Sequence, residues 1–141
     1  MFFVLVLLSA QAYGATVNEI KQSIIKQSIE MGVEPAIMLS IAKTESGFRQ
    51  EARGGSAVGV FQLLPATARN MGYNAYNLDE NIKAGITYYK NMYNRFGSME
   101  LAIAAYNMGP EAIRRANYKV PPAAQKFVAR IMADYRYYKT N

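Results

Sequence analysis

Few side chains in this 141-residue chain can do chemistry. There is no Cys and no His, which excludes Ser-His-Asp and Cys-His mechanisms and metal sites built on His or Cys ligands. We therefore expect no metal and no cofactor, and acid–base work falls to ten carboxylic acids. These are Glu19, Glu30, Glu34, Glu45, Glu51, Asp79, Glu80, Glu100, Glu111 and Asp134.

Glu45 has the most informative position among these acids. Met38, Ile41 and Ala42 share one face of an expected helix, and Glu45 continues this apolar stripe one turn later. A carboxyl group that is partly removed from water keeps its proton to higher pH, and a protonated Glu is a usable general acid. The alternative is a solvated Glu at a fraying helix end. The spacing alone leaves both interpretations open.

Helix start and stop signals show which elements would position Glu45. Thr16 and Asn77 are each followed three residues later by a Glu, the spacing of a capping box, and several prolines stand where a helix can begin. Between residues 50 and 64 the helical period breaks, and Gly54, Gly55 and Gly59 indicate turns or a small hairpin. We expect a mainly α, α+β domain with one small irregular or β segment at residues 50–64. The expected helices span about residues 16–31, 35–45, 65–72, 77–97, 98–105, 110–113 and 122–138.

The first charged side chain is Glu19, and residues 1–8 are entirely apolar. Such a stretch is shorter than the roughly 20 apolar residues that cross a bilayer, but it suits the core of an export signal. Cleavage after Gly14 assigns residues 1–14 to the signal and 15–141 to the mature domain. A structural first helix is the alternative. We expect an exported protein of the periplasm or cell envelope.

The net charge of +6, with a pI near 9.5, favours an anionic partner: nucleic acid, acidic lipid or an acidic wall polymer. The basic residues are spread from Lys21 to Lys139 without forming a run. We expect a solvated basic surface and no nucleic-acid interface. We also expect a monomer.

Further motifs extend the pattern around Glu45. They are Glu45-Ser46-Gly47-Phe48, the run from Ser56 to Ala68 that includes Gly59-Val60-Phe61-Gln62, Asn81-Ile82 with Gly85 and Tyr88, and the run from Ala104 to Pro110 that includes Tyr106-Asn107. In type and order these motifs closely resemble the catalytic domain of the soluble lytic transglycosylases. The resemblance covers about residues 20–138.

This resemblance implies a lysozyme-like fold, with Glu45 as the catalytic acid in a glycan cleft. The implied reaction cleaves the β-1,4 bond between N-acetylmuramic acid and N-acetylglucosamine in peptidoglycan and leaves a 1,6-anhydro sugar. Ser46 is expected to support Glu45, because no His is present to activate its hydroxyl. The expected substrate contacts are Gln62, Tyr106, Asn107, Ser46, Ser56 and Phe61.

Two of these contacts also have simpler interpretations. The Tyr106 hydroxyl can donate to Glu45 or to substrate, whereas its ring can merely cover the core. Gln62 can face the cleft or cap the Gly-rich loop. The Ser that is usual in this loop of the family falls at Gly54, so Ser56 is expected to take its role. Phe61 replaces a Met of the family and is expected to alter the fit of a sugar ring.

The spacing of the acids agrees with this unusual chemistry. Ordinary glycosidases use two facing carboxyl groups, but after Glu51 no acid follows until Asp79. An enzyme with one carboxyl group must find its nucleophile in the substrate. The alternatives are a hydrolytic lysozyme that acts on the same bond, or a catalytically weak glycan-binding module of a secretion or conjugation apparatus or of a phage particle.

Overall fold

The computed structural model describes residues 14–141. The expected export signal at residues 1–14 therefore lies, apart from Gly14, outside the described residues. None of the helices that are described is both long and apolar enough to cross a membrane.

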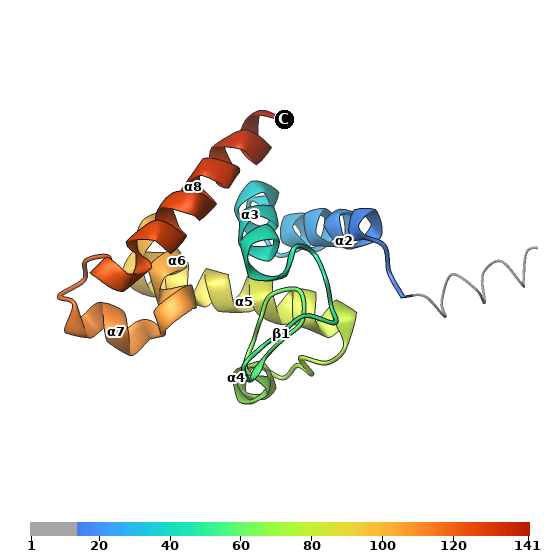
Figure 1. The fold of residues 1–141 in the computed structure, drawn as a ribbon, viewed down its shortest axis with the longest axis horizontal. Coiled ribbons are helices and arrows are strands. Elements are labelled where there is room, and N and C mark those ends of the chain that lie inside the picture. Colours follow the sequence, from blue (N-terminus) through green and yellow to red (C-terminus); the bar gives the residue numbers. More distant parts are fainter. Residues whose placement is uncertain (1–13) are drawn as a thin grey trace, which may run out of the picture.

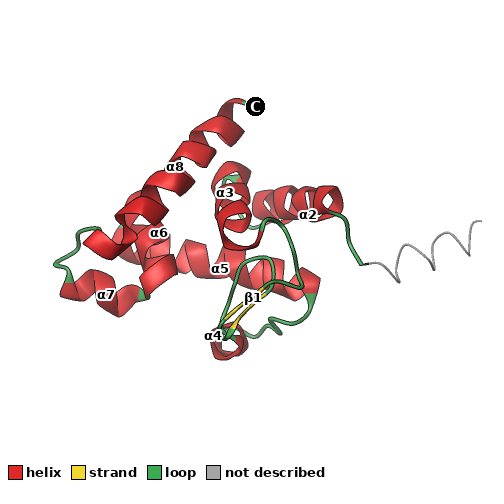
Figure 2. Ribbon diagram, viewed as in Figure 1, coloured by secondary structure: helices red, strands yellow, loops and turns green. Residues whose placement is uncertain are grey.

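Between residues 14 and 141 the chain forms seven α-helices, one 3₁₀ helix and one two-stranded hairpin (Figure 2). The mainly helical fold class expected from the sequence is confirmed. The helices are α2 (Val17–Glu30), α3 (Pro35–Ser46), α4 (Pro65–Asn70), α5 (Leu78–Phe96), α6 (Met99–Met108), α7 (Pro110–Arg115), η1 (Pro122–Ala124) and α8 (Gln125–Thr140).

The two predicted capping residues, Thr16 and Asn77, start α2 and α5. The Thr16 side chain accepts a hydrogen bond from the Glu19 N–H (3.1 Å), and the Asn77 side chain accepts one from the Glu80 N–H (3.0 Å). Ser98 caps α6 in the same way. The last helix differs from the prediction, because Pro122 opens a short 3₁₀ turn and the α-helix begins three residues later.

Helix α3 forms the centre of the core. It packs against α2 and α8, while α5 packs against α2 and α6. Apolar residues of α3 are buried on nearly every side of the helix, including the predicted stripe of Met38, Ile41 and Ala42, each with no exposed surface. A side chain near the end of α3 therefore emerges from the core rather than from a solvated helix.

The segment between α3 and α5 is irregular, as predicted. It contains β1 (Arg53–Gly54) paired antiparallel with β2 (Ala57–Val58), and an isolated bridge joins Val58 to Leu63. In Figure 1 this segment starts beside α3, crosses α5 in the view and reaches α4, drawn in green below α5, whereas α3 and α8 lie above α5. The chain thus returns past the end of α3 through turns whose backbone is not paired in a long sheet, and it needs side chains to hold it.

Candidate active site

Glu45 lies in the last turn of α3, which ends at Gly47 in the left-handed conformation (φ 61°). The carboxyl group is half-buried, and within the described residues it has no hydrogen-bond or ion-pair partner. Burial raises the pKa of Glu45 from 4.5 to about 7, because water can no longer solvate the charged form. A large fraction of Glu45 is therefore protonated at neutral pH.

Glu45 opens into a cavity of about 380 Å³, which we call the Glu45 cleft. The rest of its lining comes from β2 and the segment that follows it, from α4, from the middle of α5 and from the end of α6 with Gly109. Of the expected site residues, the cleft brings Gln62, Tyr106 and Asn107 together with Glu45. The lining residues are Glu45, Ala57, Gln62, Leu63, Leu64, Thr67, Tyr88, Tyr106, Asn107, Met108 and Gly109.

Tyr106 lines the cleft, but its hydroxyl proton is not directed as expected. It donates to the backbone carbonyl of Phe61 at 2.7 Å, in a fully buried bond. Of the two interpretations left open by the sequence, the buried ring that covers the core fits this bond, and the proton is not donated to Glu45. The ring lies edge-on to Tyr88, with centroids 5.1 Å apart. Burial, and next the nearby Glu45 carboxylate, raise the pKa of Tyr106 well above its ordinary range, so Tyr106 stays neutral.

Gln62 both faces the cleft and caps the loop. Its backbone has a positive φ of 48°, which is uncommon for a residue with a side chain. Its Nε2 donates to the carbonyls of Ala52 (3.0 Å) and Gly59 (2.9 Å), which uses both amide protons. A Cβ atom on Gly54 would lie 2.7 Å from Gln62 Oε1. A side chain at position 54 would therefore require the Gln62 amide to shift.

The other three expected substrate contacts do not line the cleft. Ser46 is buried, and its hydroxyl donates to the Val60 carbonyl at 2.7 Å, which ties the end of α3 to the loop. Phe61 has no exposed surface, and its ring packs on the backbone of Gly85, where an added Cβ would collide with it. Ser56 is exposed at the turn of the hairpin.

Two amide side chains that the sequence interpretation did not assign lie directly behind the cleft. Gln50 and Asn81 both bond the backbone of the segment after β2, and we call this pair the amide clamp. Asn81 has no exposed surface, although it stands next to two acids at a helix start where solvent is expected. In the sequence, the Asn81-Ile82 motif was the one feature that could have indicated a role for Asn81 in the site.

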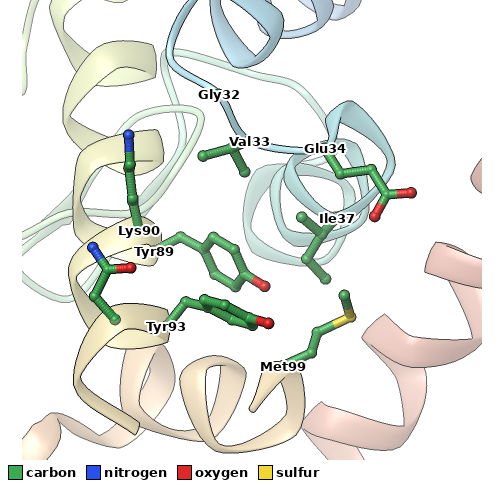
Figure 3. A pocket seen from close by; sticks show the side chains of 9 residues that line it. Gly32, Val33, Glu34, Ile37, Tyr89, Lys90, Tyr93 and Met99 are labelled. Atoms are coloured by element: carbon green, nitrogen blue, oxygen red, sulfur yellow. The ribbon is translucent and has the colours of Figure 1, made fainter. Parts of the chain in front are cut away.

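A second cavity, of about 290 Å³, lies at the opposite end of α3 (Figure 3). The Tyr89 and Tyr93 rings point into it from α5, toward Ile37. Its one acid, Glu34, is already bonded: the Tyr135 hydroxyl donates to it at 2.7 Å, and Lys139 Nζ lies 3.6 Å away. This cavity therefore offers no free acid. Its lining residues are Gly32, Val33, Glu34, Ile37, Tyr89, Lys90, Tyr93, Asn94 and Met99.

The acids of residues 14–141 do not gather into a metal site. No three of them lie close enough together to hold an ion. The chemistry of the Glu45 cleft must then be derived from one carboxyl group, neutral amides and phenol rings.

Comparisons with known proteins agree with this geometry. Residues 22–127 match the family model described as the transglycosylase SLT domain. A curated relative, the transglycosylase of enterobacteria phage PRD1, is 33% identical over 84 residues, which are 58% of this chain and 32% of the relative.

Two solved structures share the fold. One is an inactive mutant of the lytic transglycosylase Slt from Pseudomonas aeruginosa, with a TM-score of 0.73 and 24% identity. The other is the 70 kDa soluble lytic transglycosylase from Escherichia coli, with a TM-score of 0.76 and 22% identity. Each match covers 84% of this chain and 24% of the other. The chain thus spans a third or less of the length of these relatives.

Proposed function

The chain belongs to the transglycosylase SLT domain family, and from this premise we propose that it is a peptidoglycan lytic transglycosylase. It cleaves the β-1,4 bond between N-acetylmuramic acid and N-acetylglucosamine and leaves a 1,6-anhydromuramic acid end. One observation carries the proposal: within the part of the chain that the structure describes, Glu45 is half-buried and unpaired, with a pKa of about 7, in a cleft that has no second acid among its lining residues.

The lack of a second acid favours a mechanism in which groups of the substrate itself stabilise and attack the anomeric carbon. Glycosidases with two carboxyl groups hold them about 5–5.5 Å apart for retention, or about 6.5–9.5 Å apart for inversion. Among the residues that line the Glu45 cleft, Glu45 is the one carboxylic acid, and Tyr106 is held neutral. No protein group in the cleft is thus suited to attack the anomeric carbon as a carboxylate or to activate water as a second base.

In the first half of the proposed reaction Glu45 acts as an acid. It transfers its proton to the glycosidic oxygen, and the bond from this oxygen to C1 of the N-acetylmuramic acid breaks. The N-acetylglucosamine leaves with a 4-hydroxyl group. The positive charge at C1 is stabilised by the carbonyl oxygen of the 2-acetamido group on the same sugar, and Glu45 is now a carboxylate.

In the second half Glu45 acts as a base. Its carboxylate accepts the proton of the C6 hydroxyl as O6 attacks C1, which closes the 1,6-anhydro ring and frees the acetamido group. Glu45 is protonated again, and no water is consumed. Attack from within the sugar is fast because well-oriented intramolecular groups reach effective molarities of about 10⁵ M or more.

Neutral side chains would hold the glycan during both halves. Asn107 is exposed at the end of α6 and offers a donor and an acceptor to an acetamido group. Tyr88 lines the cleft and offers a ring face to a sugar, since the chain has no Trp. Gln62, with both amide protons already used, offers an acceptor.

The proposed partners and location follow from the substrate. Peptidoglycan glycan strands lie outside the cytoplasm, so we propose an exported, monomeric protein of the periplasm or cell envelope, with its domain at residues 15–141. The +6 charge suits an anionic wall. We propose two biological roles for this activity: wall turnover, and the opening of the wall for a secretion or conjugation machine that crosses the envelope.

The test is digestion of purified peptidoglycan by the full chain, with the products weighed by mass spectrometry. We expect clearing of the wall and muropeptides that are lighter by one water molecule than those with reducing ends. Reducing ends would replace the proposal with a hydrolytic lysozyme. No clearing by a folded protein would leave only the glycan-binding module.

A further inference from the structure

The wall of the Glu45 cleft is held by the amide clamp. Gln50 lies after the end of α3, and its side chain bonds in two directions: Oε1 accepts from the Val60 N–H at 3.1 Å, and Nε2 donates to the Ala75 carbonyl at 3.0 Å. Both functional groups of this amide thus bond to backbone, and together they join the segment after β2 to the chain just before α5.

Asn81, in the first turns of α5, makes three hydrogen bonds to backbone. Its Oδ1 accepts from the Phe61 N–H at 2.9 Å, and its Nδ2 donates to the carbonyls of Val58 at 2.9 Å and Ala75 at 2.8 Å. Both amide protons are used, and the side chain has no exposed surface. In a short loop without a regular sheet, these bonds replace the partners that a long β-ladder would give.

Gly59 lies between the two amides. A Cβ atom at this position would collide with the Asn81 side chain and with Gln50 Oε1, and the φ of Gly59 is +82°. Only glycine adopts this conformation with so little space available. The two side chains therefore grip the loop backbone from both sides.

The gripped segment carries the groups that close the cleft around Glu45. The Phe61 carbonyl receives the Tyr106 hydroxyl, and Gln62 and Leu63 line the cleft directly. The amide clamp therefore bonds the backbone from Val58 to Phe61, directly next to the residues that form the wall of the cleft. If the clamp is released, the segment can move away from α5, and water gains access to Glu45.

We propose that Gln50 and Asn81 are positioning residues of the active site, which hold the segment after β2 as a fixed wall and thereby keep water from the Glu45 carboxyl. For its effect on catalysis this inference rests on the proposed function. For its effect on Glu45 it does not, because the protonation of a side chain can be measured without a substrate.

The direction of the effect follows from the groups that face Glu45. The titratable neighbours in the cleft are Tyr88 from α5 and Tyr106 from α6, and burial raises the pKa of both, so both stay neutral. The residues that line the cleft include no Lys or Arg. Because burial is what raises the pKa of Glu45, a wall that admits water must lower it from about 7 toward 4.5.

The experiment compares the same substitution at two amides. Gln50→Met removes both clamp bonds of Gln50 with little change in volume and no change in charge. Gln27→Met is the matched control, because Gln27 is a buried amide whose Nε2 donates to Ser23 (3.0 Å) and Asp79 (2.7 Å), away from the cleft. Asn81→Ala is a second, more severe variant of the clamp.

The main measurement is a ¹³C NMR titration of the Glu45 carboxyl, with the pH profile of wall cleavage beside it. We expect Gln50→Met to lower the pKa of Glu45 and to move the alkaline fall in activity to lower pH, with a larger loss in kcat than change in KM. Gln27→Met should leave the titration and the pH profile in place.

The inference is overturned if Gln50→Met titrates like the wild type, or if both Met variants shift alike. If Asn81→Ala does not fold, Gln50→Met still decides. If the wild type does not cleave peptidoglycan, the proposed function fails, whereas the NMR comparison still tests the clamp.

Discussion

The two ends of α3 each present a glutamate to a cavity, and the two sites differ in what surrounds the carboxyl group. Glu34 precedes the first turn, where helix N–H groups favour an anion, and it is bonded to Tyr135 and near Lys139. Glu45 lies in the last turn and has no partner among residues 14–141. Burial raises the pKa of Glu45, and the carbonyl end of the helix disfavours its anion further. One helix thus carries a bonded acid and an acid that is unbonded within the described residues, and the unbonded one is the acid for which we propose reactivity.

The largest expected effect separates the two acids by activity. Glu45→Gln removes the proposed acid and base while it keeps the shape of the side chain, so we expect cleavage of purified peptidoglycan to fall by about 10³-fold. Glu34→Gln should change the rate by no more than about twofold, since Glu34 is not among the residues that line the Glu45 cleft and lines the other cavity. The comparison breaks if the two variants lose similar activity, or if Glu45→Gln keeps full activity.

The next effect concerns stability against pH. The folded state holds the Glu45 proton more tightly than the unfolded state, so the wild type loses stability as pH rises from about 4.5 through about 7. At about 1.4 kcal/mol per pKa unit, this loss is about 3 kcal/mol. Glu45→Gln does not suffer it, and should gain free energy of unfolding relative to the wild type over this pH range.

Urea denaturation of both proteins measures this difference. It is carried out at several pH values from roughly 4 to 8, a range that includes the pKa of Glu45 in the unfolded and in the folded state. The other acids contribute equally to both proteins and cancel. A stability difference that does not grow with pH would mean that Glu45 is as well solvated as a surface Glu.

The smallest expected effect compares the tyrosine hydroxyl at each end. Tyr106→Phe leaves the buried Phe61 carbonyl without its donor, and should cost about 2 kcal/mol of unfolding free energy. Tyr135→Phe should cost about 1 kcal/mol or less, because Glu34 is part-exposed and keeps Lys139 and water as partners. Equilibrium denaturation at pH 7 tests the order, and the reverse order would mean that the Glu34 end is the more tightly built.

The sequence predicted those features of the site that follow from local periodicity. The burial of Met38, Ile41 and Ala42 and the position of Glu45 on the same stripe follow from helical spacing alone, and the structure agrees. The caps Thr16 and Asn77 depend on residues only three positions away and were predicted for the same reason.

Features that depend on distant residues were not predictable in this way. Phe61 was expected at the substrate, but no periodicity in an irregular segment indicates which side chain faces the core, and its ring is buried on Gly85. The Tyr106 hydroxyl bonds a carbonyl 45 residues away. Gln50 gains its role only because Val60 and Ala75 fold next to it.

The close approach of Gln62 to Gly54 also constrains how this protein can change. Because Gln62 Oε1 lies close to where a Cβ at position 54 would stand, the two positions are coupled: a side chain at residue 54 requires the Gln62 amide to move, which disturbs its bonds to Ala52 and Gly59. A library that varies position 54 alone measures what this shift of Gln62 costs. A library that varies both together should recover Ser or Ala at 54 in combination with smaller residues at 62, and so reveal a second solution for the same loop.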